Sequence, residues 1–86
     1  MERQAQDIWE SGQLQGLRFD TGIADLWQQT VYNGRGLGVP LSAEYPTVNW
    51  RNEAIIIQDF AGGHIEWQNG AGRIFVAGVG ELVFLG

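Results

Sequence analysis

The sequence contains no cysteine and no lysine, and it has a single histidine. The absence of cysteine excludes thiol catalysis, disulfide bonds, zinc knuckles and iron–sulfur ligation. Because all five basic residues are arginines, Schiff-base chemistry at a lysine is excluded as well. One histidine is too few for most histidine-based metal sites. We therefore expect neither a metal site nor another cofactor.

Long apolar runs and an excess of positive charge are also missing. No stretch approaches the ~20 apolar residues of a membrane span, so membrane insertion is not expected. Ten acidic residues against five basic ones leave a net charge of -5, which disfavours binding to nucleic acid. The first seven residues lack the apolar segment of a signal peptide. If the protein is exported, we expect the signal to lie on a longer parent chain or to have been removed.

The 86 residues predict a single small domain over 1–86 with a helical first half. A short helix near residues 3–11 follows from apolar residues at helical spacing. A second helix begins after Asp20-Thr21, either of which can cap its free N–H groups. Its apolar stripe consists of Ile23, Leu26, Trp27 and Val31.

The last third predicts an antiparallel meander. Two-residue turns at Gly62-Gly63, Asn69-Gly70 and Val79-Gly80 separate its strands. The region 37–53, which contains Pro40 and Pro46, is predicted to be irregular. The fold class is therefore α+β, with one or two short N-terminal helices packed on a C-terminal four-stranded sheet. The predicted strands are Ala54–Phe60, His64–Gln68, Arg73–Ala77 and Glu81–Leu85.

These turns also assign side chains to the two faces of the sheet, because side chains alternate along a strand. The face expected to pack on the helix carries Ile56, Phe60, Ile65, Trp67, Ile74, Val76, Val83 and Leu85. The other face is polar at one edge and apolar at the other, and an apolar edge of this kind is often a contact surface. The candidate interface residues are Ile57, Phe75, Leu82 and Phe84.

The polar edge holds an acidic pair. The register predicted from Gly62-Gly63 places Asp59 opposite Glu66, with His64 nearby. Such a cluster has three readings: a glycosidase-like carboxylate pair, a cation site, or a solvated row of charges completed by Arg73. The sequence leaves all three open.

Exposed aromatic residues are the second kind of candidate. Trp27 and Trp67 stand at helix and strand positions and are expected in the core. Trp50 lies in a polar loop, and Tyr45 stands in an extended segment just before Pro46. Aromatic faces can stack on sugar rings, so Tyr45 and Trp50 are the candidate stacking residues.

Three segments of the chain resemble the LGFP repeat. The element that names the family corresponds to Leu37-Gly38-Val39-Pro40. A second element, Gln58-Asp59-Phe60-Ala61-Gly62-Gly63-His64-Ile65-Glu66-Trp67, is similar to the family's Gln-x-Phe-x-Gly-Gly-x-Ile-x-Trp run. Gly22-Ile23, Trp27 and Gly34 stand upstream at the family's spacing. The resemblance covers about 22–76 and leaves 1–21 as an N-terminal helical extension.

LGFP repeats usually occur in tandem as non-catalytic modules on secreted or wall-associated proteins, including amidases and mycolyltransferases. The resemblance therefore implies a module that anchors to cell-wall peptidoglycan or a related glycan, outside the cell or in its wall, on a longer exported protein. It supplies no catalytic residue.

Three functions are consistent with these observations. In the first, a non-catalytic module binds glycan through Tyr45, Trp50, Asp59, His64 and Glu66. In the second, a structural or oligomerisation module docks a partner chain, either a second copy or a domain of a parent protein, through the candidate interface residues. In the third, a small hydrolase uses Asp59 and Glu66 as its carboxylate pair.

Overall fold

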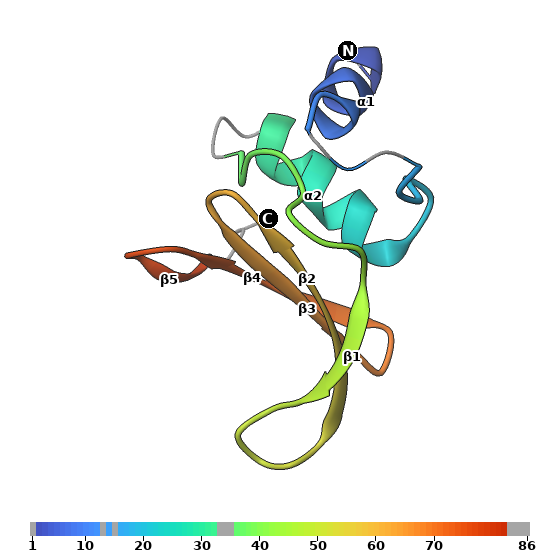
Figure 1. Cartoon of the computed structure of the whole chain (residues 1–86). Helices are drawn as coiled ribbons and strands as arrows, with labels where there is room; N and C mark the ends of the chain where they lie inside the picture. The colour runs from blue at the N-terminus through green and yellow to red at the C-terminus, as the bar shows by residue number, and fades with distance from the viewer. Residues whose placement is uncertain (1, 13, 15, 33–35, 83–86) are drawn as a thin grey trace.

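The computed structural model describes residues 2–12, 14, 16–32 and 36–82. Within this part of the chain, two helices precede a five-stranded antiparallel sheet in the order β1-β2-β3-β4-β5. Both helices lie on one side of the sheet (Figure 1), which we call the inner side; the opposite side is the outer face. The predicted α+β class is confirmed, with one strand more than expected. The elements are α1 (Glu2–Glu10), α2 (Gly22–Tyr32), β1 (Tyr45–Val48), β2 (Ala54–Phe60), β3 (Gly63–Gln68), β4 (Ala71–Val76) and β5 (Gly80–Leu82).

Helix α2 forms where its cap and its apolar stripe predict it. The Thr21 hydroxyl accepts a hydrogen bond from the Ala24 amide at 3.1 Å, which satisfies one of the free N–H groups at the helix start. Ile23 and Trp27 are buried, and Leu26 and Val31 pack against the same core. The apolar stripe of α2 packs against β3 and β4, and α1 packs against α2.

Aromatic rings make up the centre of the core. The Trp27 side chain is fully buried, and its ring centre lies 4.9 Å from that of Trp9 and 6.4 Å from that of Phe60. Phe19, in the connection between the helices, packs edge-on against both tryptophans. Aromatic side chains each remove a large apolar area from water, and so short a chain depends on that burial.

Trp67 of β3 extends this core along the inner side of the sheet. It is half-buried, and its ring lies so close to Gly22 and Gly72 that a Cβ atom at either position would overlap a neighbouring side chain. Glycine is therefore required at both positions for space. The expected core position of Trp67 is confirmed.

The segment 37–40 closes the end of the sheet where β2 turns into β3. Leu37 is buried, and its carbonyl accepts a hydrogen bond from the Gly62 amide at 2.6 Å. The Gly38 carbonyl accepts the indole N–H of Trp27 at 2.9 Å. Pro40 is buried and forms an isolated bridge with Phe60. Two of the three segments that resemble the LGFP repeat, 37–40 and 58–67, thus pack directly on one another.

The turn between β2 and β3 differs from the prediction. Ala61 and Gly62 form the turn, and Gly63 is already the first residue of β3, opposite Phe60. A Cβ atom on Gly63 would overlap the carbonyl of Phe75, so this glycine is needed inside the sheet and not at the bend. As a result Asp59 pairs with His64 and not with Glu66. Because the register moved by two residues, each side chain stays on its predicted face.

The turn between β4 and β5 also differs from the prediction, and here the faces do change. Residues 77–79 form the turn, with Gly78 at a φ of 78°, in place of the predicted Val79-Gly80 pair. Leu82 therefore pairs with Ile74, a core residue, and Glu81 pairs with Phe75. The register has moved by three residues, and an odd shift exchanges the faces of a strand, so the predicted outer-face position of Leu82 is replaced by a register position of the inner side. Phe84, Val83 and Leu85 lie outside the described residues.

Strand β1 was predicted as irregular chain. It pairs with β2 from Tyr45↔Ile57 to Val48↔Ala54 and forms one edge of the sheet. Proline is tolerated on an edge strand, where its missing N–H can face solvent. Only the pairing with β2 identifies these four residues as a strand. The Asn69-Gly70 turn, in contrast, is confirmed: Ile65 pairs with Ile74 and Glu66 with Arg73.

Candidate functional site

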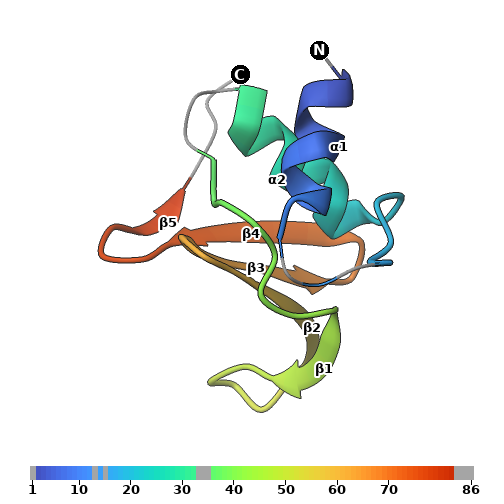
Figure 2. The same ribbon diagram turned by 45° about the horizontal axis from the view of Figure 1, so that its top comes forward.

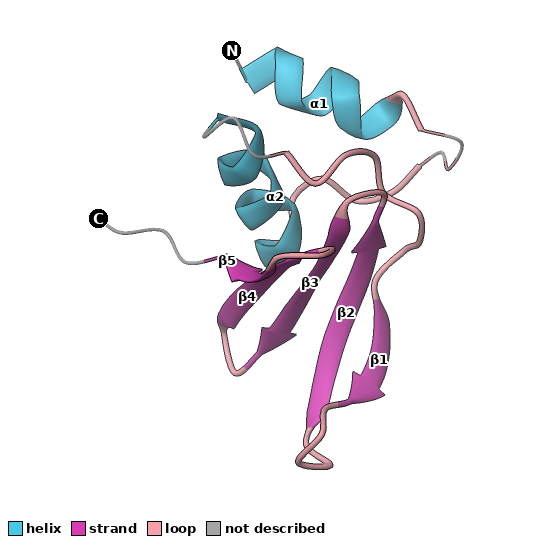
Figure 3. Ribbon diagram, turned by 90° about the vertical axis from the view of Figure 1, so that its left-hand side faces the viewer, coloured by secondary structure: helices cyan, strands magenta, loops and turns pink. Residues whose placement is uncertain are grey.

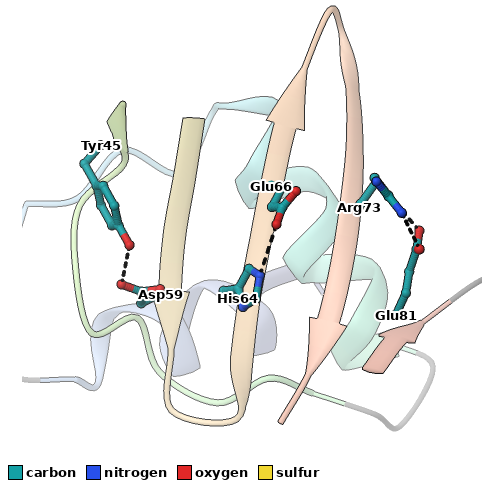
Figure 4. Close-up of polar contacts among 6 residues, drawn as sticks. All are labelled: Tyr45, Asp59, His64, Glu66, Arg73 and Glu81. Carbon is teal, nitrogen blue, oxygen red and sulfur yellow. Dashed lines mark hydrogen bonds and ion pairs between the residues drawn. The ribbon is translucent and has the colours of Figure 1, made fainter. Parts of the chain in front are cut away.

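A strip of polar and aromatic side chains crosses the outer face. Three side-by-side pairs form it: Tyr45 with Asp59, His64 with Glu66, and Arg73 with Glu81 (Figure 4). The pairs come from all five strands, and the strand register aligns them. Segments distant in sequence thus contribute to one surface.

Hydrogen bonds to both its side chain and its backbone hold Asp59 in place. The Tyr45 hydroxyl donates to Asp59 Oδ2 at 2.9 Å. The Asp59 amide donates to Ser42 Oγ at 3.1 Å, and its carbonyl accepts from the Leu41 amide at 2.8 Å. The hydrogen bond to the carboxylate raises the pKa of Tyr45, because it stabilises the protonated phenol. The carboxylate therefore has a defined position beside the β2–β3 turn.

His64 stands between Asp59 and an aromatic residue, Phe75, on the neighbouring strands. It is the register partner of Asp59 on β2 and of Phe75 on β4. Its ring stacks on Phe75 with centres 4.8 Å apart and an interplanar angle of 14°. Its Nε2 lies 3.4 Å from Glu66 Oε2. The imidazole consequently presents a fixed ring face and a fixed polar edge.

Arg73 completes the strip on β4. Its guanidinium makes two hydrogen bonds to the Glu81 carboxylate, at 2.7 and 3.0 Å, and its Cζ lies 5.5 Å from the centre of the Phe75 ring. The ion pair raises the pKa of Arg73 and lowers the pKa of Glu81, since each charge stabilises the other. Arg73 was expected to complete a charge row with Glu66, its register partner; its hydrogen bonds go to Glu81.

An open groove of about 800 Å³ lies beside this strip, between the β2–β3 turn and the β4–β5 turn. The stacked rings of His64 and Phe75 line it together with Asp59. Leu41 and Val79 are also in its lining, and their residues are 59% and 74% exposed. The groove therefore combines an aromatic stack, two exposed aliphatic side chains and one positioned carboxylate.

The predicted carboxylate pair is not formed across the strands. Asp59 faces His64, and Glu66 faces Ile57. Asp59 accepts a hydrogen bond from Tyr45, and Glu66 lies beside His64. The expectation of a directly opposed Asp59–Glu66 pair is wrong because Gly63 belongs to β3 and not to the turn.

Trp50 lies apart from the other four candidate ligand-binding residues. It occupies the loop between β1 and β2, which projects beyond the rest of the sheet (Figure 3). The residue is 84% exposed, and the Arg51 guanidinium lies 4.8 Å from its ring centre. The structure thus brings Tyr45, Asp59, His64 and Glu66 onto one face and places Trp50 at the tip of a hairpin.

Of the candidate interface residues, Phe84 lies outside the part of the chain that the structure describes, and the described side chains of Ile57 and Phe75 do not form an open apolar patch. Ile57 and Phe75 are half-buried on the outer face, and Phe75 is covered by His64 and Arg73. Leu82 stands at a register position of the inner side, opposite Ile74. The outer face near Phe75 is therefore more polar than predicted.

Two lining residues of the groove were not singled out from the sequence. Leu41 reaches the groove because 37–41 runs along the end of β2, and Val79 reaches it because residues 77–79 form the β4–β5 turn. Phe75 was assigned to this face, but as an interface residue. The glycine at position 78 was the only local signal for the wider turn, since a positive φ suits a three-residue hairpin loop.

Comparison of the chain with protein-family models, curated proteins and solved structures found no match. Among the described residues, no three His, Asp or Glu side chains converge as ligands for a metal ion. In the same part of the chain, no helix has the length and apolar character needed to cross a membrane.

Proposed function

We propose that this protein is a non-catalytic binding module whose outer face binds a glycan, with cell-wall peptidoglycan as its ligand on a wall-associated or secreted parent protein. The observation that carries the proposal is the groove in which the His64–Phe75 stack, exposed aliphatic side chains and the Asp59 carboxylate meet. The groove is open to solvent, so a ligand would lie along it and would not be enclosed.

The chemistry of the groove suits a sugar ring. A pyranose has an apolar C–H face and a rim of hydroxyl groups. The C–H face of the sugar can pack on the apolar surface of Leu41, Val79 and the aromatic stack. The hydroxyl groups of its rim can donate hydrogen bonds to carboxylate oxygens. Because Tyr45 and Ser42 already hold Asp59 in place, little side-chain ordering is left to oppose binding.

The charge of the outer face disfavours ligands of high negative charge density. Asp59, Glu66 and Glu81 stand there against Arg73, and Arg73 is neutralised by Glu81. Such a surface repels densely charged polyanions and favours hydroxyl-rich polymers, whose few carboxylates can point away from the face.

The arrangement of the carboxylates supports binding over hydrolysis. A retaining glycosidase needs two carboxyl groups ~5 Å apart on either side of the scissile bond. Asp59 and Glu66 are not cross-strand partners, and each has its own side-chain neighbour. Unchanged hydrolysis in an Asp59→Asn variant would remove the hydrolase hypothesis altogether.

Retention on insoluble peptidoglycan, with soluble glycans as competitors, tests the proposal. We expect the folded wild-type protein to be retained, and we expect Leu41→Ala and Asp59→Asn to weaken binding roughly tenfold each, equivalent to about 1.4 kcal/mol. Leu14→Ala and Asp25→Asn are matched controls, because both residues are exposed and lie outside the groove. Folded wild-type protein that binds neither peptidoglycan nor any soluble glycan would overturn the proposal.

The alternative, a structural module that docks a partner chain through Ile57, Phe75, Leu82 and Phe84, stays a prediction. Light scattering across a range of concentrations tests it. A monomer whose mass does not change with concentration contradicts self-association through this face.

A further inference from the structure

We infer that the outer face holds a linear polysaccharide at two separate contacts, the groove beside His64 and the exposed ring of Trp50, so that tight binding requires a strand long enough to reach both. This inference rests on the proposed function, because it names the form of glycan that the same face binds.

The loop that carries Trp50 is held by hydrogen bonds. The Asn49 side-chain oxygen accepts from the amides of Arg51 and Glu53 at 2.9 and 3.0 Å, and its Nδ2 donates to the Glu53 carboxylate at 3.0 Å. Asn52 has a φ of 62°, a left-handed conformation that asparagine tolerates. These hydrogen bonds hold the loop in one conformation, in which Trp50 is 84% exposed.

This loop folds toward the outer face. Alternation along β2 places Ile55 on the outer face, and it does not belong to the inner core. Ile55 is nevertheless only 4% exposed, so other residues cover it on the outer side. The pKa of Glu53 is lowered first by the hydrogen bond from Asn49 and then by the Gln68 side chain, which alternation along β3 places on the same face as His64 and Glu66. Figure 2 shows the β1–β2 loop on the side of the sheet away from the helices. The loop that carries Trp50 and the groove thus lie on the same side of the sheet.

The two contacts are too far apart for one sugar ring. Asp59, at the groove, lies six residue steps after Glu53, at the end of the loop, and all the residues between them belong to β2. At ~3.3 Å per residue this places the two ends on the order of 20 Å apart. Tyr45 stands along this path on β1 and is 38% exposed. A ligand that uses both ends must be a chain of several sugar units.

Linking two weak contacts through one ligand raises affinity strongly. The second contact then forms within the complex, at an effective concentration set by the strand, and the gain is on the order of 10²-fold or more. Strands too short to span the distance gain nothing. Affinity should therefore rise abruptly with strand length, and the rise should depend on Trp50.

A length series of peptidoglycan glycan strands, from the disaccharide upward, tests this by calorimetric titration. We expect the Kd of the wild-type protein to fall by on the order of 10²-fold once strands span both contacts. Trp50→Ala should lose that gain, and Trp50→Phe, which keeps a ring for stacking, should retain most of it. Val48→Ala is the matched control, because Val48 is 55% exposed on the same hairpin.

The outcomes separate the two claims. Retention of the wild-type protein on intact peptidoglycan without any length-dependent gain overturns the two-contact inference and leaves the proposed function standing. An equal loss for Trp50→Ala at every length also overturns it, since Trp50 would then belong to the same contact as the groove. Self-association that depends on Trp50 in light scattering would assign the ring to a second copy instead. Absence of retention on peptidoglycan counts against the proposed function itself.

Discussion

Trp27 and Trp50 are the same type of side chain on opposite sides of the sheet. Trp27 is fully buried among aromatic rings and donates its indole N–H to Gly38. Trp50 is 84% exposed and stands in the β1–β2 loop, which lies on the side of the sheet away from the helices (Figure 2). The inner side is stabilised by apolar burial, whereas the outer face is organised by hydrogen bonds and ion pairs between exposed groups, which contribute little to stability. Substitutions on the two sides should therefore have separable effects on folding and on binding.

The largest expected effect comes from exchanging each of these tryptophans for alanine. Trp27→Ala should lower the free energy of unfolding by about 3–5 kcal/mol, because it leaves a cavity in the core and frees the Gly38 carbonyl. Trp50→Ala should change it by less than about 0.5 kcal/mol. Urea denaturation followed by circular dichroism measures both. Comparable losses in the two variants would contradict the contrast between the faces.

The second effect compares two glycines. Gly63→Ala should destabilise the fold by about 1–3 kcal/mol, because the new methyl group would overlap the Phe75 carbonyl and crowd Leu37. Gly36→Ala is the control, since its Cβ would meet only Val31 at ordinary contact distance. Thermal melts should show a Tm that is clearly lower for the first variant and close to wild type for the second. A normal Tm for Gly63→Ala would mean that the strand register differs from the one described.

The smallest effect concerns the Arg73–Glu81 ion pair. Because the pKa of Glu81 is lowered in the folded state, the pair stabilises the protein above the ordinary carboxyl value of 4.5, and this stabilisation is lost as the pH falls through the lowered value. Glu81→Gln should therefore melt slightly below wild type at pH 7, with a difference that shrinks toward pH 2 and in 1 M salt. If the pair is the cause, adding Arg73→Gln to Glu81→Gln should produce little further loss.

Much of the fold follows from local patterns. Helical spacing predicted both helices and the buried positions of Ile23 and Trp27, and alternation placed Asp59, His64 and Glu66 together on one face. Strand β2 has its predicted bounds. The resemblance to the LGFP repeat and the ligand that it implies stay predictions.

The errors have a common origin in the turns. Local preference favours a diglycine bend, but the carbonyls of Leu37 and Val39 bind the amides of Gly62 and Ala61 and draw those two residues into the turn. A three-residue turn after β4 likewise moved Leu82 to the inner side. Strand β1 has too few residues and one proline, so only its pairing with β2 defines it.

Residue order alone determined that this chain has an apolar side and a polar side, because the periodicities of helix and strand are properties of neighbouring residues. The tertiary structure alone decided which groups meet: Asp59 with Tyr45, His64 with Phe75, and Leu41 with Val79 around one groove. The physical reason is that pairing partners depend on where each turn begins. The start of a turn depends in part on hydrogen bonds to segments far away in the sequence, which no local pattern encodes.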